Sequence, residues 1–473
     1  MRRKNLKKDS NLSSNLVGDS YGEEPKHIDD IIGKAQLVGQ RYDNWIINTE
    51  NKIYIYNPSV GIWEPHSIKS ISKRLLFKDL IDDSNASKKL KPVIKALELI
   101  FHKENFPNYE SENGGNVLVF KNNALNPLTG EELAFSPYHY SRNAIGYHFD
   151  STAHCEEWET FIDQTFARDS DSEQKIALLQ EFMGLSLTNV VKFQQMLLMF
   201  GAGSNGKSVI LKVLESLVGE GNASHVALKD FSSKFSLVKL TGKLVNIDSD
   251  VDYDAMRQDG VFKKIISGDE IMVEEKHQNG FKFRPCAKLW MAANVLPRIK
   301  NGALGYYRRI IILEFNNVVK KEDQDKELIN KLLEELPGIL NWAVVGLKRL
   351  MENNAFTVPE SSEAALKNYE LENNHAKLFF YEKLVLVDQT VSQGTKKSIV
   401  FEEFTKFLSE NQFPKIDSAK FGKELKALGV TDRKSGGNRF YGVDIKHDSL
   451  LNDSVKEPLS DAANDEDSIK VAA

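Results

Sequence analysis

The stretch FGAGSNGKSVILKVLESL, which begins at Phe200, has residue types and spacing suited to holding phosphate. It contains a glycine, four further residues and then Gly-Lys-Ser, the pattern of a phosphate-binding loop. Backbone amides at such a turn and the positive end of a helix dipole attract anionic oxygens, and Lys207 adds a full positive charge. Ser208 supplies a hydroxyl for Mg²⁺. The predicted site for ATP and Mg²⁺ comprises Gly201, Gly203, Asn205, Gly206, Lys207 and Ser208.

The flanks of this loop are those of a strand and a helix. The preceding run QQMLLMF is typical of a buried parallel strand. Apolar residues then recur at helical spacing from Ile210 to Leu217, and Gly219 offers a stop. The alternative is a glycine turn with a chance Gly-Lys-Ser, and the flanks favour the phosphate site.

Nucleotide hydrolysis also needs an acid at the end of a neighbouring strand. The segment TGKLVNIDSDVD is an apolar strand that ends in Asp248 and Asp250. Either carboxylate could hold Mg²⁺ or polarise water. A solvated acidic loop with turn-forming aspartates is the alternative.

Two further polar positions adjoin predicted strands. Asn294 follows a strongly apolar strand, where its amide could orient the attacking water or sense the γ phosphate. Arg308 and Arg309 immediately precede another apolar strand in GYYRRIIILEF. A positioned arginine neutralises transition-state charge, whereas a surface pair at a strand start is the alternative. Between the acidic strand and the asparagine strand, a predicted hairpin carries Lys276 and His277 near its tip.

The segment from Lys396 to Lys446 reads as two helices followed by a two-stranded hairpin, with Ser418 expected to cap the second helix. This segment has 11 basic and 7 acidic residues, a net charge of +4. Apolar residues fall on one face of the second helix and lysines on the other, which favours a winged helix that binds duplex DNA over a merely solvated helix. The candidate DNA contacts are Lys420, Lys423, Lys426, Arg433, Lys434 and Arg439.

These elements imply an α/β protein with several domains along its 473 residues. We expect a P-loop core with a parallel sheet, a small mixed α/β domain and helical collar before it, and a winged helix after it. The expected segments are a disordered basic arm (1–30), the small mixed domain (31–148), the collar (149–192), the nucleotide domain (193–345), a helical lid and linker (346–395), the winged helix (396–447) and an acidic disordered tail (448–473).

Composition narrows the classes of protein further. The net charge of −5 gives no global basic field, so the basic C-terminal segment is a local feature. Cys155 and Cys286 are far apart and lack His or Cys neighbours at ligand spacing, which argues against a disulfide framework or zinc site. No apolar run reaches membrane-spanning length, and the polar N-terminus lacks the core of a secretion signal. We expect a cytoplasmic protein without membrane partners.

The order of phosphate loop, acidic strand, hairpin, asparagine strand and arginine resembles that of superfamily 3 helicases, compact AAA+ ATPases of viruses, phages and mobile elements. The likeness is greatest to satellite-phage and plasmid primase-helicases and the poxvirus primase-helicase. It covers most of 115–445 and includes the motifs GAGSNGKS, IISGD, KLWMAANVLP, YYRRIIILEF, FKNNALNPLTGEELAFSP and ALLQEFMGLSL.

The resemblance implies specific roles and a ring, usually a hexamer, that grips one DNA strand. It favours Asp250 over Asp248 as the acid of the second motif, although relatives often have Glu there. It implies that Asn294 is the sensor and Arg309 the finger that completes a neighbour's site. Lys276 and His277 match the Lys-His pair of a DNA-tracking hairpin in papillomavirus replicative helicases.

We therefore expect an ATP-dependent replicative DNA helicase and replication initiator of a phage or mobile element. Its expected partners are single-stranded DNA, origin duplex DNA, further copies of itself and host replication proteins. One alternative is a nucleotide-regulated winged-helix transcription factor without unwinding activity. Another is a complete primase-helicase, but about 150 residues before the collar are too few for a primase domain, so any primase is expected to be a separate protein.

Overall fold

The computed structural model describes residues 52–66, 116–253, 259–277, 279–298, 304–387, 394–411 and 413–446, with the backbone of β1 (Ile46–Thr49) and a few helical positions between 92 and 100. The expected N-terminal arm and C-terminal tail lie outside these residues, as do most of residues 71–83 and 93–103, whose apolar pattern predicts helices. The chain forms two compact units, one of Met1–His148 with Glu274–Phe283 and the other of Phe149–Val273 with Arg284–Ala473. No helix among the described residues is long and apolar enough to cross a membrane.

In the part of the first unit that the structure describes, two small antiparallel sheets are present. One sheet has β1, β2 (Lys52–Asn57) and β3 (Ile62–His66) in that order. Its core consists of Tyr54, Tyr56 and Trp63, and the Trp63 indole donates a 2.9 Å hydrogen bond to the Pro137 carbonyl. The other sheet has β4 (Leu118–Val119), β5 (Ala124–Asn126) and β6 (Glu131–Leu133).

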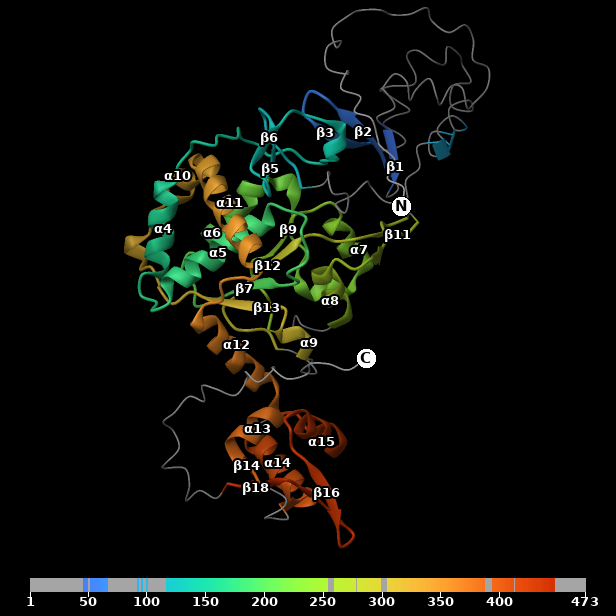
Figure 1. The fold of residues 1–473 in the computed structure, drawn as a ribbon, viewed down its shortest axis with the longest axis vertical. Helices are drawn as coiled ribbons and strands as arrows, with labels where there is room; N and C mark the ends of the chain where they lie inside the picture. Colours follow the sequence, from blue (N-terminus) through green and yellow to red (C-terminus); the bar gives the residue numbers. More distant parts are fainter. Residues whose placement is uncertain are drawn as a thin grey trace, which may run out of the picture. The chain divides into compact units, whose positions relative to one another are not determined.

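The second unit is built on a five-stranded sheet whose neighbouring strands are all parallel. Its strands are β7 (Met196–Phe200), β8 (Ala223–Ser224), β9 (Val245–Asp248), β12 (Lys288–Ala293) and β13 (Ile310–Glu314). Their order across the sheet is β13-β7-β12-β9-β8, so β7 lies between β12 and β13 (Figure 1). The carboxyl ends of parallel strands meet at one edge, which brings the loops after β7, β9 and β12 together. The expected α/β fold with a parallel sheet is confirmed.

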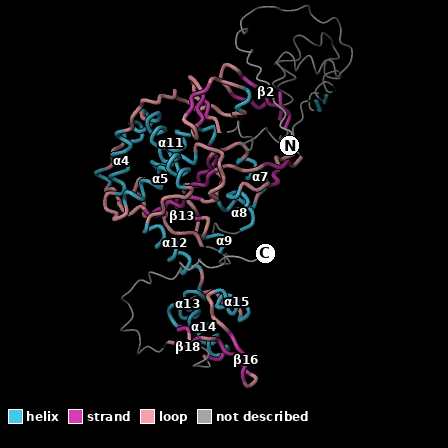
Figure 2. The backbone as a smooth tube through the Cα atoms, viewed as in Figure 1, coloured by secondary structure: helices cyan, strands magenta, loops and turns pink. Residues whose placement is uncertain are grey.

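Helices surround this sheet (Figure 2). Helices α4 (Glu156–Phe166) and α5 (Ser172–Ser186), in the segment expected to form a collar, precede it, and α10 (Leu328–Glu334), α11 (Leu336–Asn353) and α12 (Glu360–Asn373) follow it. Helix α5 packs along α11, while α12 lies against β13. A Cβ added at Gly346 would lie 2.4 Å from the Gln180 backbone, so this helix crossing requires glycine. Shorter elements complete the unit: α6 (Lys207–Val218), α7 (Lys234–Leu237), α8 (Asp259–Ser267), α9 (Leu304–Tyr307) and β10 (Ile271–Val273).

Residues 375–446 form a C-terminal module with its own apolar core. Its elements are α13 (His375–Lys383), β14 (Leu384–Leu386), β15 (Thr395–Lys396), α14 (Lys397–Glu410), α15 (Ser418–Ala427), β16 (Asp432–Ser435), β17 (Asn438–Tyr441) and β18 (Val443–Ile445). The two predicted helices and the hairpin are confirmed as α14, α15 and β16-β17. The core begins at Ala376, because Phe379 of α13 packs on Phe404 and Phe421 of the two later helices.

One local prediction in the C-terminal module is wrong. Asp417, not Ser418, is the N-cap of α15, and its carboxylate accepts hydrogen bonds from the amides of Ala419 and Lys420 at 3.0 and 2.9 Å. Aspartate and serine are comparably good caps, so sequence alone does not separate adjacent candidates.

Candidate functional site

The phosphate loop connects the end of β7 to the start of α6. Helix α6 begins at Lys207 and is preceded by Gly206, whose φ of 89° lies in the left-handed region. A Cβ at Gly201 would lie 2.4 Å from the carbonyl oxygen of Phe315, whereas one at Gly203 would meet nothing within 4 Å. The glycine at position 201 therefore permits close approach of the loop to the chain after β13, and Gly203 faces open space.

Hydrogen bonds fix the loop in place. Asn205 is buried, and its amide nitrogen donates to the Phe315 carbonyl at 3.1 Å. The Lys207 ammonium donates to the carbonyls of Gly201 at 2.6 Å and Ala202 at 3.1 Å, and to the Asn205 side-chain oxygen at 3.0 Å. Burial lowers the pKa of Lys207. An anionic phosphate beside this ammonium would favour its charged form.

Asn294 reaches the phosphate loop from the next strand of the sheet. Ala293, the last residue of β12, pairs with Phe200 at the end of β7. This register places the Asn294 side-chain oxygen 3.4 Å from the Lys207 ammonium. Two groups that the sequence nominates separately thus lie side by side.

The two candidate aspartates differ in their surroundings. Asp248 ends β9 and is buried, and its carboxylate accepts a 2.7 Å hydrogen bond from the Leu228 amide. Burial raises the pKa of Asp248, against the opposing effect of backbone hydrogen bonds from Leu228 and Asp250. Asp250 is exposed, and the next residue, Val251, donates its amide to the Ala292 carbonyl at 2.9 Å. Asp248 therefore anchors the segment that begins at Leu228, whereas Asp250 is exposed to solvent.

Mg²⁺ bound to a nucleotide keeps most of its ligands as phosphate oxygens and water, with one or two protein groups. Ser208, the second residue of α6, and Asp250 are both exposed and carry suitable oxygens. Among the described residues, no group of three or more His, Cys, Asp or Glu side chains could hold a metal ion.

The two adjacent arginines before β13 lie in different environments. Arg309 is 7% exposed, and its guanidinium donates to the Gly305 carbonyl at 2.6 Å and to the Ser267 hydroxyl at 3.4 Å. Burial and the charge of Arg308 lower the pKa of Arg309. Arg308 is exposed. In the isolated chain, Arg309 is therefore engaged within its own fold, and its neighbour is the accessible cation.

Lys276 and His277 lie at an exposed turn between β10 and β11 (Phe281–Phe283). His277 has a φ of 66°, an uncommon conformation for a residue with a side chain. Residues Glu274–Phe283 belong to the first unit, where Glu275 lies 3.3 Å from the Lys52 ammonium. The turn thus presents both predicted DNA contacts to solvent.

The basic residues of the C-terminal module line α15 and its hairpin. Phe421 and Leu425 are buried while the three lysines of α15 are exposed, as the helical pattern predicts. On the hairpin, Lys434 pairs directly opposite Arg439, and both are exposed. Like charges at such a position repel each other, which an anionic partner would relieve. Arg433 is half-buried, so it is the least accessible of the six candidates, the others being Lys420, Lys423, Lys426, Lys434 and Arg439.

Sequence reasoning missed the residues that anchor the far side of the phosphate loop. Lys175 of α5 is fully buried, and its ammonium donates to the Glu314 carbonyl at 3.1 Å and lies 3.0 Å from the Asp169 carboxylate. These contacts hold the end of β13, beside the Phe315 carbonyl that binds Asn205. The available signal was a lysine within the apolar face of a collar helix.

The chain is similar to a family of proteins and to solved structures. Residues 199–309, which run from the phosphate loop to Arg309, match a family of unknown function, DUF5906. Two solved apo structures of the C-terminal region of NrS-1 are similar to the chain, each with a TM-score of 0.51 and 12% sequence identity. In both comparisons the similarity covers 89% of this chain and 100% of the other. The chain therefore shares its fold with the C-terminal region of NrS-1.

Proposed function

We propose that this protein is an ATP-dependent replicative DNA helicase and replication initiator of a phage or other mobile element, active as a ring, usually a hexamer. One observation carries the proposal: the phosphate loop and Asn294 meet at the carboxyl edge of a single parallel sheet, with 3.4 Å between the Lys207 ammonium and the Asn294 oxygen. The sequence motifs that resemble those of superfamily 3 replicative helicases support a role in replication.

Each element at this edge has a distinct task in the proposed reaction. The amides of the loop and Lys207 would bind the β and γ phosphates of ATP, and Ser208 would ligate Mg²⁺. Asp250 would polarise the attacking water, while buried Asp248 positions the strand end. Asn294 would orient that water or sense the γ phosphate. Hydrolysis converts ATP to ADP, so the γ phosphate beside Asn294 is lost. The segments that follow the strands can change conformation in response to that loss.

An arginine of a neighbouring protomer completes this site in the proposal. Such a residue must reach out of its own fold, and the resemblance to superfamily 3 helicases assigns the role to Arg309. The exposure of Arg308 and the internal hydrogen bonds of Arg309 make Arg308 the second candidate for the same role. Arg309 could serve only if assembly released it from the Gly305 carbonyl.

The DNA contacts divide between two places. The exposed turn with Lys276 and His277 would follow the phosphates of the single strand inside the ring. Helix α15 and the β16-β17 hairpin would bind origin duplex as a winged helix, with the helix in a groove and the hairpin on phosphate. The opposed Lys434 and Arg439 support an anionic partner at the hairpin.

The decisive test combines three measurements on the full-length chain. We expect ATP hydrolysis that single-stranded DNA stimulates, displacement of a strand from forked DNA, and rings in electron microscopy with a non-hydrolysable ATP analogue. A protein that binds duplex DNA and ATP but never displaces a strand would be the nucleotide-regulated transcription factor instead. A chain that stays monomeric with nucleotide and DNA would refute the shared site.

A further inference from the structure

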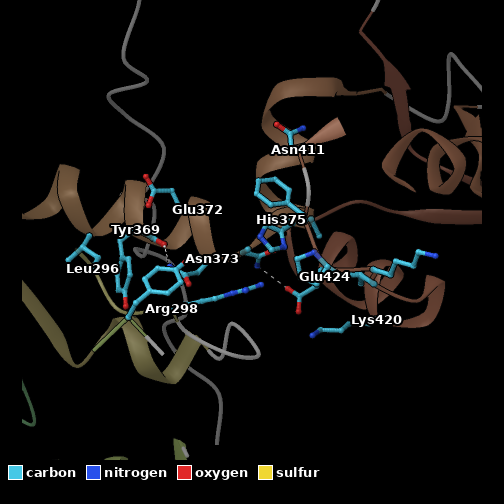
Figure 3. A pocket seen from close by; sticks show the side chains of 16 residues that line it. Leu296, Arg298, Tyr369, Glu372, Asn373, His375, Asn411, Lys420 and Glu424 are labelled. Atoms are coloured by element: carbon cyan, nitrogen blue, oxygen red, sulfur yellow. Dashed lines mark hydrogen bonds between the residues drawn. The ribbon is translucent and has the colours of Figure 1, made fainter. Parts of the chain in front are cut away.

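A separate hollow lies within the second unit, where the end of α12 meets α13 and α15 (Figure 3). Its volume is about 660 Å³, in the range of roughly 300–1,000 Å³ that holds small-molecule ligands. The lining comes from three distant parts of the chain: Tyr253 after β9, Arg298 after β12, and the segment around α13 and α15. In Figure 3, Arg298 extends from one wall toward the wall that carries His375 and Glu424.

Two stacked rings form an aromatic surface in this cavity. The imidazole of His375 and the ring of Phe413 lie 4.0 Å apart between centroids, with 19° between their planes. Burial lowers the pKa of His375, and the charges of Arg298 and Lys420 add to the effect. The imidazole is therefore mainly neutral at pH 7, and it contributes a flat surface rather than another cation.

Cations and amides surround the stacked rings. Arg298, Lys415 and Lys420 line the cavity, and the two lysines are exposed. The carboxylate of Glu424 is already engaged, since it accepts a 3.2 Å hydrogen bond from the Asn374 amide. The side chains of Asn373 and Asn411 also line the cavity, where their amides donate hydrogen bonds to the carbonyls of Tyr369 and Phe407 at 2.8 and 2.9 Å.

This combination fits one class of ligand. Aromatic faces stack on nucleobases without regard to sequence, and cations bind the phosphates of a strand. We propose that the cavity binds a nucleotide unit of single-stranded nucleic acid, with the base against Phe413 and His375 and the phosphates at Arg298 and Lys420. The inference rests on the proposed function, because it gives the unwound strand a second contact outside the Lys276 turn.

The cavity wall continues into the nucleotide site. The Arg298 amide donates to the Tyr253 carbonyl at 2.6 Å, which ties the segment after Asn294 to the segment after Asp250. The Tyr369 hydroxyl of α12 donates to the Pro297 carbonyl on the same segment. A strand held by Arg298 would therefore contact both strand-end segments that lead to bound ATP, which gives it a route to stimulate hydrolysis.

Photocrosslinking tests the location directly. Full-length protein is irradiated with an oligonucleotide of 5-iododeoxyuridine, and cross-linked peptides are identified by mass spectrometry. We expect cross-links to the peptides that contain His375 or Phe413, and excess free dTMP should not remove them. Cross-links confined to the Lys276 turn would overturn the inference, and so would equally effective competition by dTMP, since the ligand would then be a free nucleotide.

Matched variants test the individual contacts by fluorescence anisotropy with labelled oligothymidylate. Phe413→Leu keeps an apolar side chain but loses the ring, and we expect roughly 5- to 100-fold weaker binding of the single strand. Arg298→Gln and Lys420→Gln should each lower the salt dependence of binding by about 0.7 in slope. Lys406→Gln, at an exposed position of α14 outside the cavity, should leave single-strand binding unchanged. Equal effects at positions 420 and 406 would contradict the proposed site.

Failure of this inference is distinguishable from failure of the proposed function. A protein that hydrolyses ATP and displaces strands without cavity cross-links would retain the function and refute the cavity as a strand site. Cavity cross-links in a protein without ATP hydrolysis would support the strand site and refute the motor. Arg298→Gln should also reduce the stimulation of hydrolysis by single-stranded DNA more than the rate without DNA.

Discussion

The ammonium nitrogen of Lys207 lies 3.4 Å from the side-chain oxygen of Asn294, 87 residues further along the chain. The register of two parallel strands explains this proximity, because Ala293 pairs with Phe200 and both strands end at the same edge. The amide and the ammonium can therefore act on the same phosphate.

Replacing Lys207 removes the full positive charge of the phosphate loop. Lys207→Ala should lower steady-state ATP hydrolysis by about 10²-fold or more, because this charge stabilises the phosphate oxygens. Origin duplex binding should persist, since its contacts lie in the C-terminal module. Lys212→Ala is the matched control, because Lys212 is on the same helix but exposed and paired with Glu215 at 3.3 Å. A Lys207→Ala protein with full turnover would exclude the loop from the reaction.

Separate substitutions distinguish the two candidate aspartates. Asp250→Asn should reduce turnover by about 10²–10⁴-fold, the range for losing a group that polarises water. Asp248→Asn should have a much smaller effect on turnover, since an amide oxygen can still accept the hydrogen bond from Leu228. Single-turnover hydrolysis at saturating ATP measures the difference. The reverse ranking would assign the catalytic role to Asp248.

Asp248 also gives the stability of the protein a defined dependence on pH. Burial raises its folded pKa above the ordinary value of 3.8, so its contribution to stability is fully present below pH 3.8 and is lost as pH rises through the folded value. Asp248→Asn removes this titration. In urea unfolding, the free energy of unfolding of Asp248→Asn minus that of wild type should therefore increase as pH rises from about 4 to 7. Asp250→Asn, at an exposed position, serves as the control. A constant difference across this pH range would contradict the raised pKa.

The adjacent arginines should separate stability from turnover. Arg309→Ala should lower the free energy of unfolding by about 1–3 kcal/mol, because hydrogen bonds to the Gly305 carbonyl and Ser267 hydroxyl are lost. Arg308→Ala should leave stability within about 0.5 kcal/mol, as expected of an exposed residue. If Arg308 is the finger, Arg308→Ala should bind ATP with normal affinity but hydrolyse it about 10³-fold or more slowly.

Mixing experiments then decide which arginine crosses the interface. Inactive Lys207→Ala and inactive arginine variants each lack a different half of the shared site. Mixed rings should regain part of the hydrolysis for the arginine that acts in trans. If neither arginine variant is complemented at any ratio while mixed rings form, the shared-site proposal fails.

The C-terminal module can be removed by ending the chain directly before it. A chain that ends at Asn373 should keep ATP hydrolysis and lose binding to origin duplex, measured by electrophoretic mobility. A chain that ends at residue 395 should instead aggregate, since it leaves Phe379 and Leu384 without the core supplied by α14 and α15. Equal origin affinity in the shorter chain would remove the module from origin recognition.

Point variants in the module refine this test without disturbing its core. Lys423→Gln and Arg439→Gln should each lower the salt slope of duplex binding by about 0.9, as expected for one phosphate contact. Lys406→Gln is the control, because Lys406 is exposed on α14 and lies 2.7 Å from Glu403. A control that weakens duplex binding equally would indicate only a general effect of charge.

Many of the individual strands and helices could be predicted from the sequence, because they depend on residues that are close together along the chain. The run of apolar residues before Gly201 predicts β7, the helical spacing after Lys207 predicts α6, and the alternating residues near Tyr54 predict β2 and β3. Such features follow from backbone geometry and from burying one face of each element. The choice of a nucleotide site also depends on short-range spacing, because the loop and its helix are contiguous.

Relationships between distant residues depended on the tertiary structure. Sequence nominates both Asp248 and Asp250, but burial and the Leu228 amide separate them. The resemblance to superfamily 3 helicases implies that Arg309 is the finger, whereas packing buries that side chain and leaves Arg308 exposed. The cavity at Arg298, His375 and Phe413 leaves no signal in the sequence, since its three parts meet only after the strands and helices pack. Spacing along the chain determined the types of chemistry present, and the packing of strand ends and helices decided which side chains can perform it.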